Sequence, residues 1–289
     1  MKIGNREFDT ENKAYIMGIL NATPDSFSDG GRFYIPEDSA GAREKMDFIL
    51  RETEKMIADG MDIIDIGGES TRPGYTQISD EEEISRVVPV IEAVKKNFDI
   101  PVSLDTYKSK VALEGIKAGA DLINDIWGLK YDPAMAGVIA ESNVACCLMH
   151  NRKDTDYVNY IEDVKTDLKE SLKIASDAGI HKERIIIDPG VGFAKSYEQN
   201  LQIIDGLDEL LTIGYPILLG TSRKSVIGLT LNIPASERVE GTIATTVIGR
   251  MRGAAFFRVH DVKENKRALD MTEAIIRSRK REDGLKALM

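Results

Sequence analysis

Cysteine is scarce in this sequence. Only two occur among 289 residues, Cys146 and Cys147, and they are adjacent. Neighbouring residues on a strand point to opposite faces, which argues against a shared metal site or a disulfide framework, so we expect two buried, reduced thiols. Long apolar runs are also missing, because no stretch approaches the roughly 18 apolar residues of a membrane-spanning helix. The sequence therefore predicts neither a disulfide scaffold nor a membrane protein.

Basic charge is in deficit. The 38 Lys and Arg residues against 48 Asp and Glu residues give a formal net charge of -10. Proteins that bind nucleic acid or membrane surfaces generally present basic surface, so this balance argues against both as partners. The basic run from Arg277 to Arg281 ends an expected amphipathic helix, where cations interact favourably with the helix dipole. The polar segment Met1–Lys13 lacks the apolar core of a secretory signal, and we expect a cytoplasmic protein.

Short apolar runs alternate with longer helical patterns along the whole chain, and eight such pairs can be counted. The expected strands are Tyr15–Leu20, Asp62–Ile66, Pro101–Leu104, Leu122–Asn124, Val144–Met149, Ile185–Ile187, Pro216–Leu219 and Ala255–Val259. The expected helices are Pro36–Asp59, Asp80–Asn97, Tyr107–Ala118, Pro133–Glu141, Tyr157–Ala178, Tyr197–Leu211, Ser236–Arg252 and Asp261–Arg281. This order predicts an α/β fold, a single (β/α)8 TIM barrel over residues 1–289. An open doubly wound sheet fits less well, because its Gly-x-Gly-x-x-Gly turn is missing.

Residues at the helix ends agree with this division. Ser79 precedes three acidic residues of a first helical turn, and Pro133 suits a first helical position. Gly60, Gly119 and Gly179 each follow a helical run, where a left-handed cap is common. The connections 21–35 and 67–79 are long for a compact barrel, and loops of this kind are more often functional lids than packing elements.

Polar residues follow nearly every expected strand. A single Asp after a strand is more often a turn former or a helix cap, and we favour that interpretation for Asp65 and Asp125. In a barrel, however, the carboxyl ends of all strands meet at one rim, where active sites are built. The group supplies acceptors on one side and cationic donors on the other: Asn21, Asp105, Asn124 and Asp188 with Lys224, Arg258 and His260. The rim therefore predicts a ligand with a donor-rich edge and an anionic part.

The segment Gly220–Ser225 follows the seventh strand and opens a helix, where free N–H groups attract anions. It lacks the spacing of a nucleotide-binding P-loop, and no Gly-x-Ser-x-Gly elbow or Cys/His pair indicates a covalent nucleophile. We therefore expect a chemistry that depends on positioning and charge.

Seven ordered motifs resemble those of the dihydropteroate synthase family of folate biosynthesis. They cover almost the whole chain: Met17–Gly31 (MGILNATPDSFSDGG), Asp65–Gly74 (DIGGESTRPG), Ser103–Thr106 (SLDT), Ile123–Gly128 (INDIWG), Asp188–Phe193 (DPGVGF), Thr221–Ser225 (TSRKS) and Arg258–Asp261 (RVHD). The resemblance implies that 6-hydroxymethyl-7,8-dihydropterin pyrophosphate reacts with p-aminobenzoate to give 7,8-dihydropteroate and pyrophosphate. It also implies a homodimer.

The resemblance further implies a role for individual residues. Those implied to bind the pterin are Asp105, Asn124, Ile126, Met149, Asp188, Phe193, Gly220, Lys224 and Arg258. Those implied to bind pyrophosphate are Asn21, Thr71, Arg72, Arg258 and His260, with Asn21 as the ligand of a Mg²⁺ cofactor. Those implied to bind p-aminobenzoate are Phe27, Pro73, Phe193, Lys224 and Ser225. The catalytic set implied is Asp25, Thr71, Arg72, Lys224, Arg258 and His260.

Two alternatives remain open at this point. A methyltransferase that uses methyltetrahydrofolate would share the pterin-edge residues, but it would not need the Lys224, Arg258 and His260 cluster. A catalytically silent paralogue would bind a pterin without turnover.

The sequence departs from the family pattern at Ala22 and Ala194, which are small replacements. The segment after His150 is less typical, which leaves Asn151 and Arg152 without an assigned role.

Overall fold

The protein is seen here as a computed structural model, which describes residues 1–22, 39–69 and 77–286. Eight parallel strands form one sheet in the order β8-β7-β6-β5-β4-β3-β10-β9, and a parallel bridge between Ile187 and Ile217 joins its two ends. The strands are β3 (Tyr15–Asn21), β4 (Ile63–Gly67), β5 (Val102–Asp105), β6 (Leu122–Asp125), β7 (Ala145–Met149), β8 (Ile185–Asp188), β9 (Leu218–Leu219) and β10 (Phe256–Val259). The barrel prediction is confirmed, and the open doubly wound sheet was the wrong alternative.

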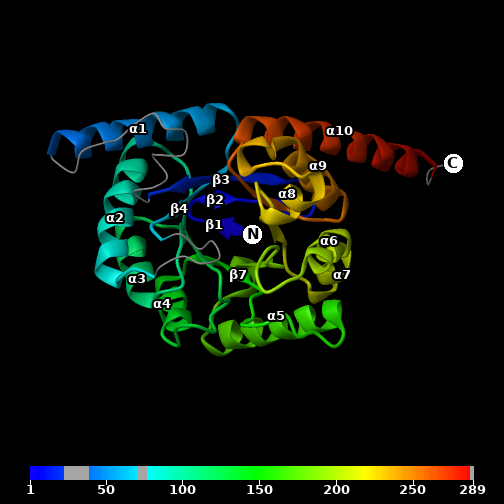
Figure 1. The fold of residues 1–289 in the computed structure, drawn as a ribbon, viewed down its shortest axis with the longest axis horizontal. Coiled ribbons are helices and arrows are strands. Elements are labelled where there is room, and N and C mark those ends of the chain that lie inside the picture. Colours follow the sequence, from blue (N-terminus) through cyan, green and yellow to red (C-terminus); the bar gives the residue numbers. More distant parts are fainter. Residues whose placement is uncertain (23–38, 70–76, 287–289) are drawn as a thin grey trace.

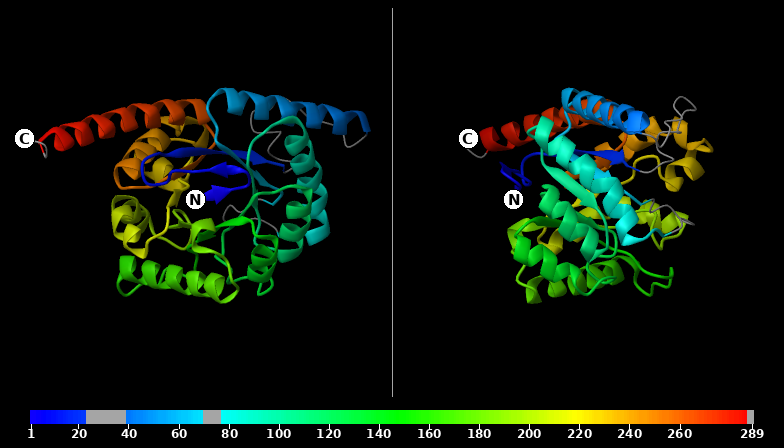
Figure 2. Two further views of the ribbon diagram at one scale, coloured as in Figure 1. Left: turned by 180° about the vertical axis from the view of Figure 1, so that it is seen from behind. Right: turned by 90° about the vertical axis from the view of Figure 1, so that its left-hand side faces the viewer.

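Helices surround the strands on the outside of this barrel (Figure 1). They are α1 (Ser39–Ala58), α2 (Asp80–Asn97), α3 (Ser109–Ala118), α4 (Met135–Ser142), α5 (Tyr160–Asp177), α6 (Tyr197–Asp205), α7 (Leu207–Leu210), α8 (Ser225–Leu231), α9 (Val239–Met251) and α10 (Val262–Lys286). Short 3-10 turns lie at η2 (Lys182–Arg184), η3 (Leu211–Ile213) and η4 (Ala235–Glu237). Helix α10 extends past the barrel as far as Lys286 (Figures 1 and 2).

Most of the expected helix signals are confirmed. The Ser79 hydroxyl accepts a hydrogen bond from the Glu82 backbone N–H at 3.1 Å, and the three capping glycines have φ of +98°, +116° and +88°. Three expectations were wrong in detail. Pro133 lies before α4, which begins at Met135, and the helix expected over residues 197–211 is interrupted at Gly206, where α6 ends and α7 begins. The expected helix from Ser236 is a 3-10 turn followed by α9.

The strands alternate between two apolar environments, as the pleat requires. One set of side chains packs outward against the helices, including Ile64, Ile123 and Cys146. The other set fills the inside of the barrel: Met17, Ile63, Leu122, Ala145, Cys147, Ile186, Leu218 and Phe256. Cys146 and Cys147 are both buried and free, and they belong to different clusters, which confirms that they point to opposite faces.

The amino-terminal end of the barrel is closed by a hairpin that the sequence did not predict. Strands β1 (Lys2–Ile3) and β2 (Arg6–Glu7) pair antiparallel, and Ile3 and Phe8 join the inner cluster. The Phe8 ring lies 4.7 Å from Tyr15 and 5.7 Å from Phe256, measured between centroids. This end of the barrel interior is therefore packed with apolar and aromatic side chains. Figure 2 shows the hairpin at this end.

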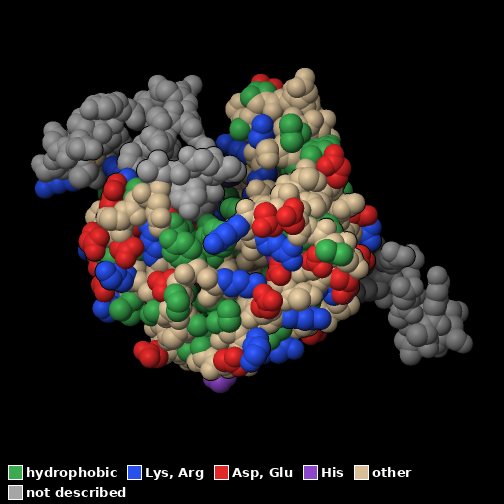
Figure 3. Space-filling model, turned by 60° about the horizontal axis from the view of Figure 1, so that its bottom comes forward, with side chains coloured by type: hydrophobic (Ala, Val, Ile, Leu, Met, Phe, Trp, Pro, Cys, Tyr) green, Lys and Arg blue, Asp and Glu red, His purple; other side chains and the backbone are tan. Residues whose placement is uncertain are grey.

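The surface carries charges of both signs. On the face drawn in Figure 3, acidic and basic side chains are interspersed. Among the described residues, no helix is both long enough and apolar enough to cross a membrane.

Candidate active site

The strand register brings polar side chains together at the carboxyl end of the barrel. Asn21 is paired with Gly67, Gly67 with Asp105, and Asp105 with Asn124 across neighbouring strands. Two strands further on, Met149 is paired with Asp188. Leu122 and Ile186 face the barrel interior, so Asn124 and Asp188, two residues later, face the same space one layer higher. The predicted convergence on one rim is confirmed.

Arg258 joins two carboxylates across this layer. Its Nε donates to Asp65 Oδ2 at 2.6 Å, and its Nη2 donates to Asp105 Oδ2 at 2.7 Å. Burial by itself would lower the pKa of Arg258, but the carboxylates of Asp65 and Asp105 outweigh burial and raise it. Nη1 makes no hydrogen bond to the part of the chain that the structure describes. The guanidinium is therefore permanently charged and retains free donor capacity.

Asp65 was assigned wrongly from the sequence. It is fully buried inside β4 and accepts hydrogen bonds from Ser103 Oγ at 2.5 Å and from Arg258, so it is neither a turn former nor a helix cap. A charged residue between Ile64 and Ile66 was the available signal, because a carboxylate in a buried strand requires a partner. For Asp125 the interpretation as a turn former is confirmed, since its carboxylate accepts hydrogen bonds from the Trp127 and Leu129 backbone N–H groups at 2.8 and 2.7 Å.

Three buried acceptors around Arg258 have unused hydrogen-bonding capacity. Asp105 Oδ1 is buried and has no hydrogen-bond partner among the described residues. Burial raises the pKa of Asp105 to about 7, although the charge of Arg258 opposes this. The Asn124 side chain, 4% exposed, makes no hydrogen bond within the described ranges, and Asp188 uses only Oδ1, which accepts the Gly190 N–H at 2.7 Å. A buried orphan acceptor is unfavourable, so these groups are arranged for donors from outside the chain.

Lys224 lies beside these acceptors. Its Nζ donates to the Val191 carbonyl and is 4.8 Å from the centroid of the Phe193 ring. Burial lowers the pKa of Lys224 to about 8, and the charge of Asp188 opposes that shift. Gly220 keeps the neighbouring space open, because a Cβ there would lie 3.7 Å from Asp188 Oδ2 and 3.9 Å from Arg258 Cβ.

An apolar wall completes the site. Ile126 and Met149 form one cluster with Tyr107, and Trp127 and Phe193 pack against it. This cluster is separate from the two larger apolar clusters of the barrel. Ile126, Met149 and Phe193, which the family resemblance implies for the pterin, thus lie at one cluster, and a flat ring system could rest against them.

The remaining predicted residues fall into two groups. His260 follows β10 and its Nδ1 shares a 2.9 Å hydrogen bond with Ser222 Oγ; Ser225 is exposed at the start of α8. Asn21 ends β3, with its Oδ1 4.0 Å from the Cβ position that Gly67 lacks. Among the described residues, no group of three or more His, Cys, Asp or Glu could hold a metal ion. Five predicted residues lie outside the described ranges: Asp25, Phe27, Thr71, Arg72 and Pro73.

The site thus combines a layer of acceptors with unused hydrogen-bonding capacity, two cations and the apolar wall. The comparison with protein families agrees with this arrangement. The family described as pterin binding enzymes matches residues 17–260. The chain therefore belongs to the pterin-binding enzyme family.

Individual relatives narrow this class. A dihydropteroate synthase from Clostridium beijerinckii is 60% identical over 278 residues, which is 96% of this chain and 100% of the relative. A solved dihydropteroate synthase from Clostridium difficile, in the presence of pteroic acid, has a TM-score of 0.87 and 49% identity, covering 93% of this chain and 99% of that one. One from Xanthomonas albilineans with 4-aminobenzoic acid has a TM-score of 0.83 and 39% identity, covering 91% and 93%. Within the family, this chain stands with the dihydropteroate synthases, and these relatives favour that activity over the methyltransferase alternative.

Proposed function

We propose that this site condenses 6-hydroxymethyl-7,8-dihydropterin pyrophosphate with p-aminobenzoate, which yields 7,8-dihydropteroate and pyrophosphate. The observation that carries the proposal is the unpaired Asp105 Oδ1 next to the unused amide of Asn124 and the free oxygen of Asp188. The amino and ring N–H groups of a pterin edge are donors, and carboxylate and amide oxygens are their natural partners.

The pterin would lie across the apolar wall of Ile126, Met149 and Phe193 with its edge toward the three acceptors. Lys224 would donate to the pterin ring, and Gly220 would leave room for it. Arg258 can hold Asp65 and Asp105 through Nε and Nη2 while Asp105 Oδ1 accepts from the ligand, so binding breaks no existing ion pair. The guanidinium would then cover the ring face, where a cation on a π-system is favourable.

Bond cleavage in this reaction separates the exocyclic methylene carbon from the pyrophosphate oxygen. The electron pair leaves with pyrophosphate, and the p-aminobenzoate nitrogen supplies the pair for the new C–N bond and loses a proton. No protein nucleophile is required. Charge stabilisation is the task of the chain, and Arg258 Nη1 and His260, with Thr71, Arg72 and Asp25 of the two long connections, are the groups that we assign to it.

A magnesium cofactor fits this site only together with the substrate. Asn21 offers one amide oxygen, a hard donor of the type that Mg²⁺ accepts, and the described residues supply no carboxylate cluster around it. The ion would therefore be held by Asn21, pyrophosphate oxygens and water. When bound, it would neutralise the charge of the departing pyrophosphate.

The second substrate would enter between Phe193, Lys224 and Ser225, and the family resemblance also assigns Phe27 and Pro73 to it. The Lys224 charge and the N–H groups around Ser225 suit a carboxylate.

For the quaternary structure we propose a homodimer, supported by exposed apolar side chains on α8, α9 and α10: Leu229, Ile248, Met251, Met271 and Ile275. Light scattering after gel filtration tests the dimer. The cytoplasmic location stays a prediction from the sequence.

The experiment for the proposed function is a pyrophosphate-release assay with Mg²⁺ and the pterin pyrophosphate, with and without p-aminobenzoate, and with the product identified by mass. Dihydropteroate formed only with both substrates supports the proposal. Tight pterin binding without any product would favour a silent paralogue.

A further inference from the structure

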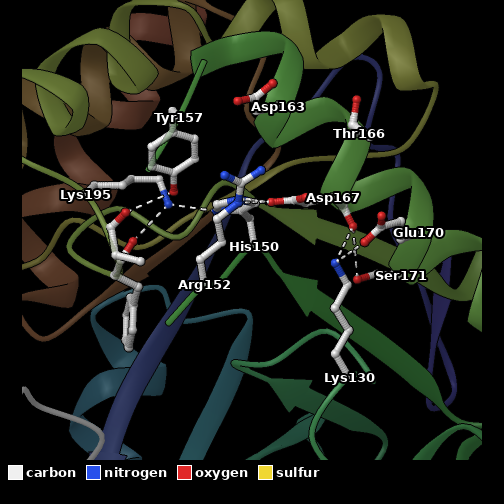
Figure 4. Close-up of polar contacts among 12 residues, drawn as sticks. Lys130, His150, Arg152, Tyr157, Asp163, Thr166, Asp167, Glu170, Ser171 and Lys195 are labelled. Carbon is white, nitrogen blue, oxygen red and sulfur yellow. Dashed lines mark hydrogen bonds and ion pairs between the residues drawn. The ribbon is translucent and has the colours of Figure 1, made fainter. Parts of the chain in front are cut away.

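A chain of partly buried polar contacts links β7, α5 and the loop after β8 (Figure 4). His150 directly follows β7, and its side chain is fully buried. Its Nε2 is 2.9 Å from Asp167 Oδ2 on α5, and its Nδ1 is 2.9 Å from Lys195 Nζ. Lys195 Nζ also donates to the Phe193 carbonyl at 3.0 Å.

The direction of these hydrogen bonds follows from chemistry. A lysine ammonium has no acceptor, so it donates to Nδ1, and the single proton of a neutral imidazole must then lie on Nε2, which donates to Asp167. Burial and the charge of Lys195 lower the pKa of His150 to about 3, so the ring stays neutral at physiological pH. His150 therefore bridges a cation and an anion that do not contact each other.

Asp167 is held in turn by Arg152. The Arg152 Nε donates to Asp167 Oδ2 at 2.5 Å, and its guanidinium lies 4.4 Å from the centroid of the Tyr157 ring. Tyr157 then donates its hydroxyl hydrogen to the Ala194 carbonyl at 2.9 Å. Arg152, which had no assigned role, is thus part of this network.

Both ends of the network reach one segment, the 190–195 loop. This loop follows Asp188 and carries Phe193, and its Val191 carbonyl accepts the hydrogen bond from Lys224. Ala194 has a φ of +46°, a left-handed conformation that is unfavourable for alanine and needs support from its surroundings. At the start of the loop, Gly190 passes so close to His150 that a Cβ would lie 2.0 Å from the His150 carbonyl oxygen.

We propose that Asp167, His150 and Lys195 form a positioning chain that fixes the 190–195 loop, and with it Phe193 and the carbonyl that holds Lys224. None of the three residues is among those that we assign to the substrates, and Lys195 reaches the site through the Phe193 carbonyl, so we assign them a role that acts through the loop. The inference rests on the proposed function for its kinetic consequences only, because loop position can be measured without any substrate. It gives His150 a role that depends on an acceptor and a donor on opposite sides of one ring.

The chain does not depend on the charge state of Lys195. Burial lowers the pKa of Lys195 to about 7, but a neutral amine still has two N–H groups for His150 and Phe193. The hydrogen bonds of Lys195, and not its titration, carry the effect.

Two substitutions at one position separate positioning from space filling. His150→Gln keeps one acceptor and one donor about as far apart as the two ring nitrogens, whereas His150→Leu fills the space without either. Misplacing a group in a catalytic site by about 1 Å lowers rates by up to about a hundredfold. We expect His150→Leu to lower kcat/KM at least about tenfold with a higher KM for the pterin substrate, and His150→Gln to stay within about threefold of the native protein.

The single tryptophan of the sequence supplies a readout without substrate. Trp127 packs against the same apolar cluster as Phe193, so we expect its fluorescence to respond when Phe193 moves relative to that cluster. We expect the emission of the ligand-free protein to shift in His150→Leu and in Lys195→Met, and to stay native in His150→Gln. Lys195→Met also serves if His150→Leu fails to fold, because methionine keeps most of the length of this half-buried side chain.

A matched control contacts the same helix, α5, from the segment between β6 and α4. Lys130 Nζ contacts Glu170 Oε2 and the Asp167 carbonyl, each at 2.9 Å, outside the chain of three residues (Figure 4). Lys130→Met should change kcat/KM less than about twofold, because a partly exposed ion pair contributes little. Equal kinetics and equal emission for His150→Leu and His150→Gln would overturn the proposal. A native protein that makes no dihydropteroate would instead refute the proposed function, while the order of the emission shifts would still decide the positioning chain.

Discussion

The two ends of the barrel interior differ sharply although the same strands build both. At the amino-terminal end, the inward side chains are apolar and a hairpin covers them: Met17, Ile63, Leu122, Ile186 and Phe256. Two residues later on the strands, the inward side chains are Asp65, Asn124, Asp188 and Arg258, with Asp105 on β5 beside them. Roughly 7 Å along a strand separates these layers. Stability and recognition are therefore assigned to successive layers of one alternating pattern.

The polar layer is unfavourable on its own. Burying charged groups is costly even when they are paired, and Asp105 retains an oxygen without any partner. The apolar layer below offsets this through close packing of large side chains. Substitutions in the two layers should consequently have opposite signatures, one on turnover and the other on the free energy of unfolding.

The largest expected effect is that of Lys224→Ala in the polar layer. Removing a charged donor from a catalytic site lowers turnover about a hundred- to a thousandfold, so we expect a loss of that size in kcat/KM. The melting temperature should not fall, since a buried cation disappears. Steady-state kinetics and thermal unfolding measure both quantities, and native kinetics would remove Lys224 from the site.

Phe256→Ala in the apolar layer should show the opposite signature. Truncating a fully buried Phe destabilises a protein by about 3–5 kcal/mol through lost burial and a residual cavity. The folded fraction should keep kcat/KM within about threefold. Urea unfolding, together with kinetics at urea concentrations below the transition, provides the test. A stable but inactive variant would contradict the assignment of stability to the apolar layer and of turnover to the polar layer.

The pH profile should show the buried lysine. The pKa of Lys224 is lowered to about 8 by burial, so the ammonium is present below this pH and is lost above it. We expect kcat/KM to fall about tenfold per pH unit on the alkaline side. Lys224→Arg, whose guanidinium stays charged, should flatten this limb even if the plateau is lower. An unchanged alkaline limb in that variant would assign the titration to another group.

The smallest expected effect concerns magnesium. Asn21→Ala removes one amide oxygen from an ion otherwise held by pyrophosphate and water, so we expect only a severalfold weaker binding of Mg²⁺ in the presence of pyrophosphate. Titration calorimetry with pyrophosphate present, and with pyrophosphate omitted as the control, measures this. Identical Mg²⁺ affinity in the variant would exclude Asn21 as a ligand.

The sequence was sufficient for the barrel and for most of the polar layer, because both depend on short-range patterns. Apolar runs gave the strands, and Asp105, Asn124 and Asp188 could be located as the residues that end them. Asp65 was misassigned because its role depends on the ion pair with Arg258, which is 193 residues away in the chain.

The hairpin and the positioning chain were missed for the same physical reason. A two-residue strand carries no periodic signal, and Phe8, which follows the hairpin, packs against Phe256, far away in the chain. The partners Asp167 and Lys195 lie on a helix and a loop where charged residues are ordinary, and only the fold brings them to His150. A local sequence pattern does not show which polar groups will pair when they are far apart in the chain.

The most direct test of the account is the proton balance when pteroic acid binds, measured by calorimetry between pH 6 and 8. Because burial holds the pKa of Asp105 at about 7, the free carboxyl is protonated below that pH and ionised above it. If Oδ1 accepts a pterin N–H, binding favours the ionised form, so protons are released at pH 6 to 7 and affinity rises with pH. The account predicts this release in the native protein, and its loss in Asp105→Asn together with about ten- to a hundredfold weaker binding. Equal affinity and equal proton release in both proteins would contradict it.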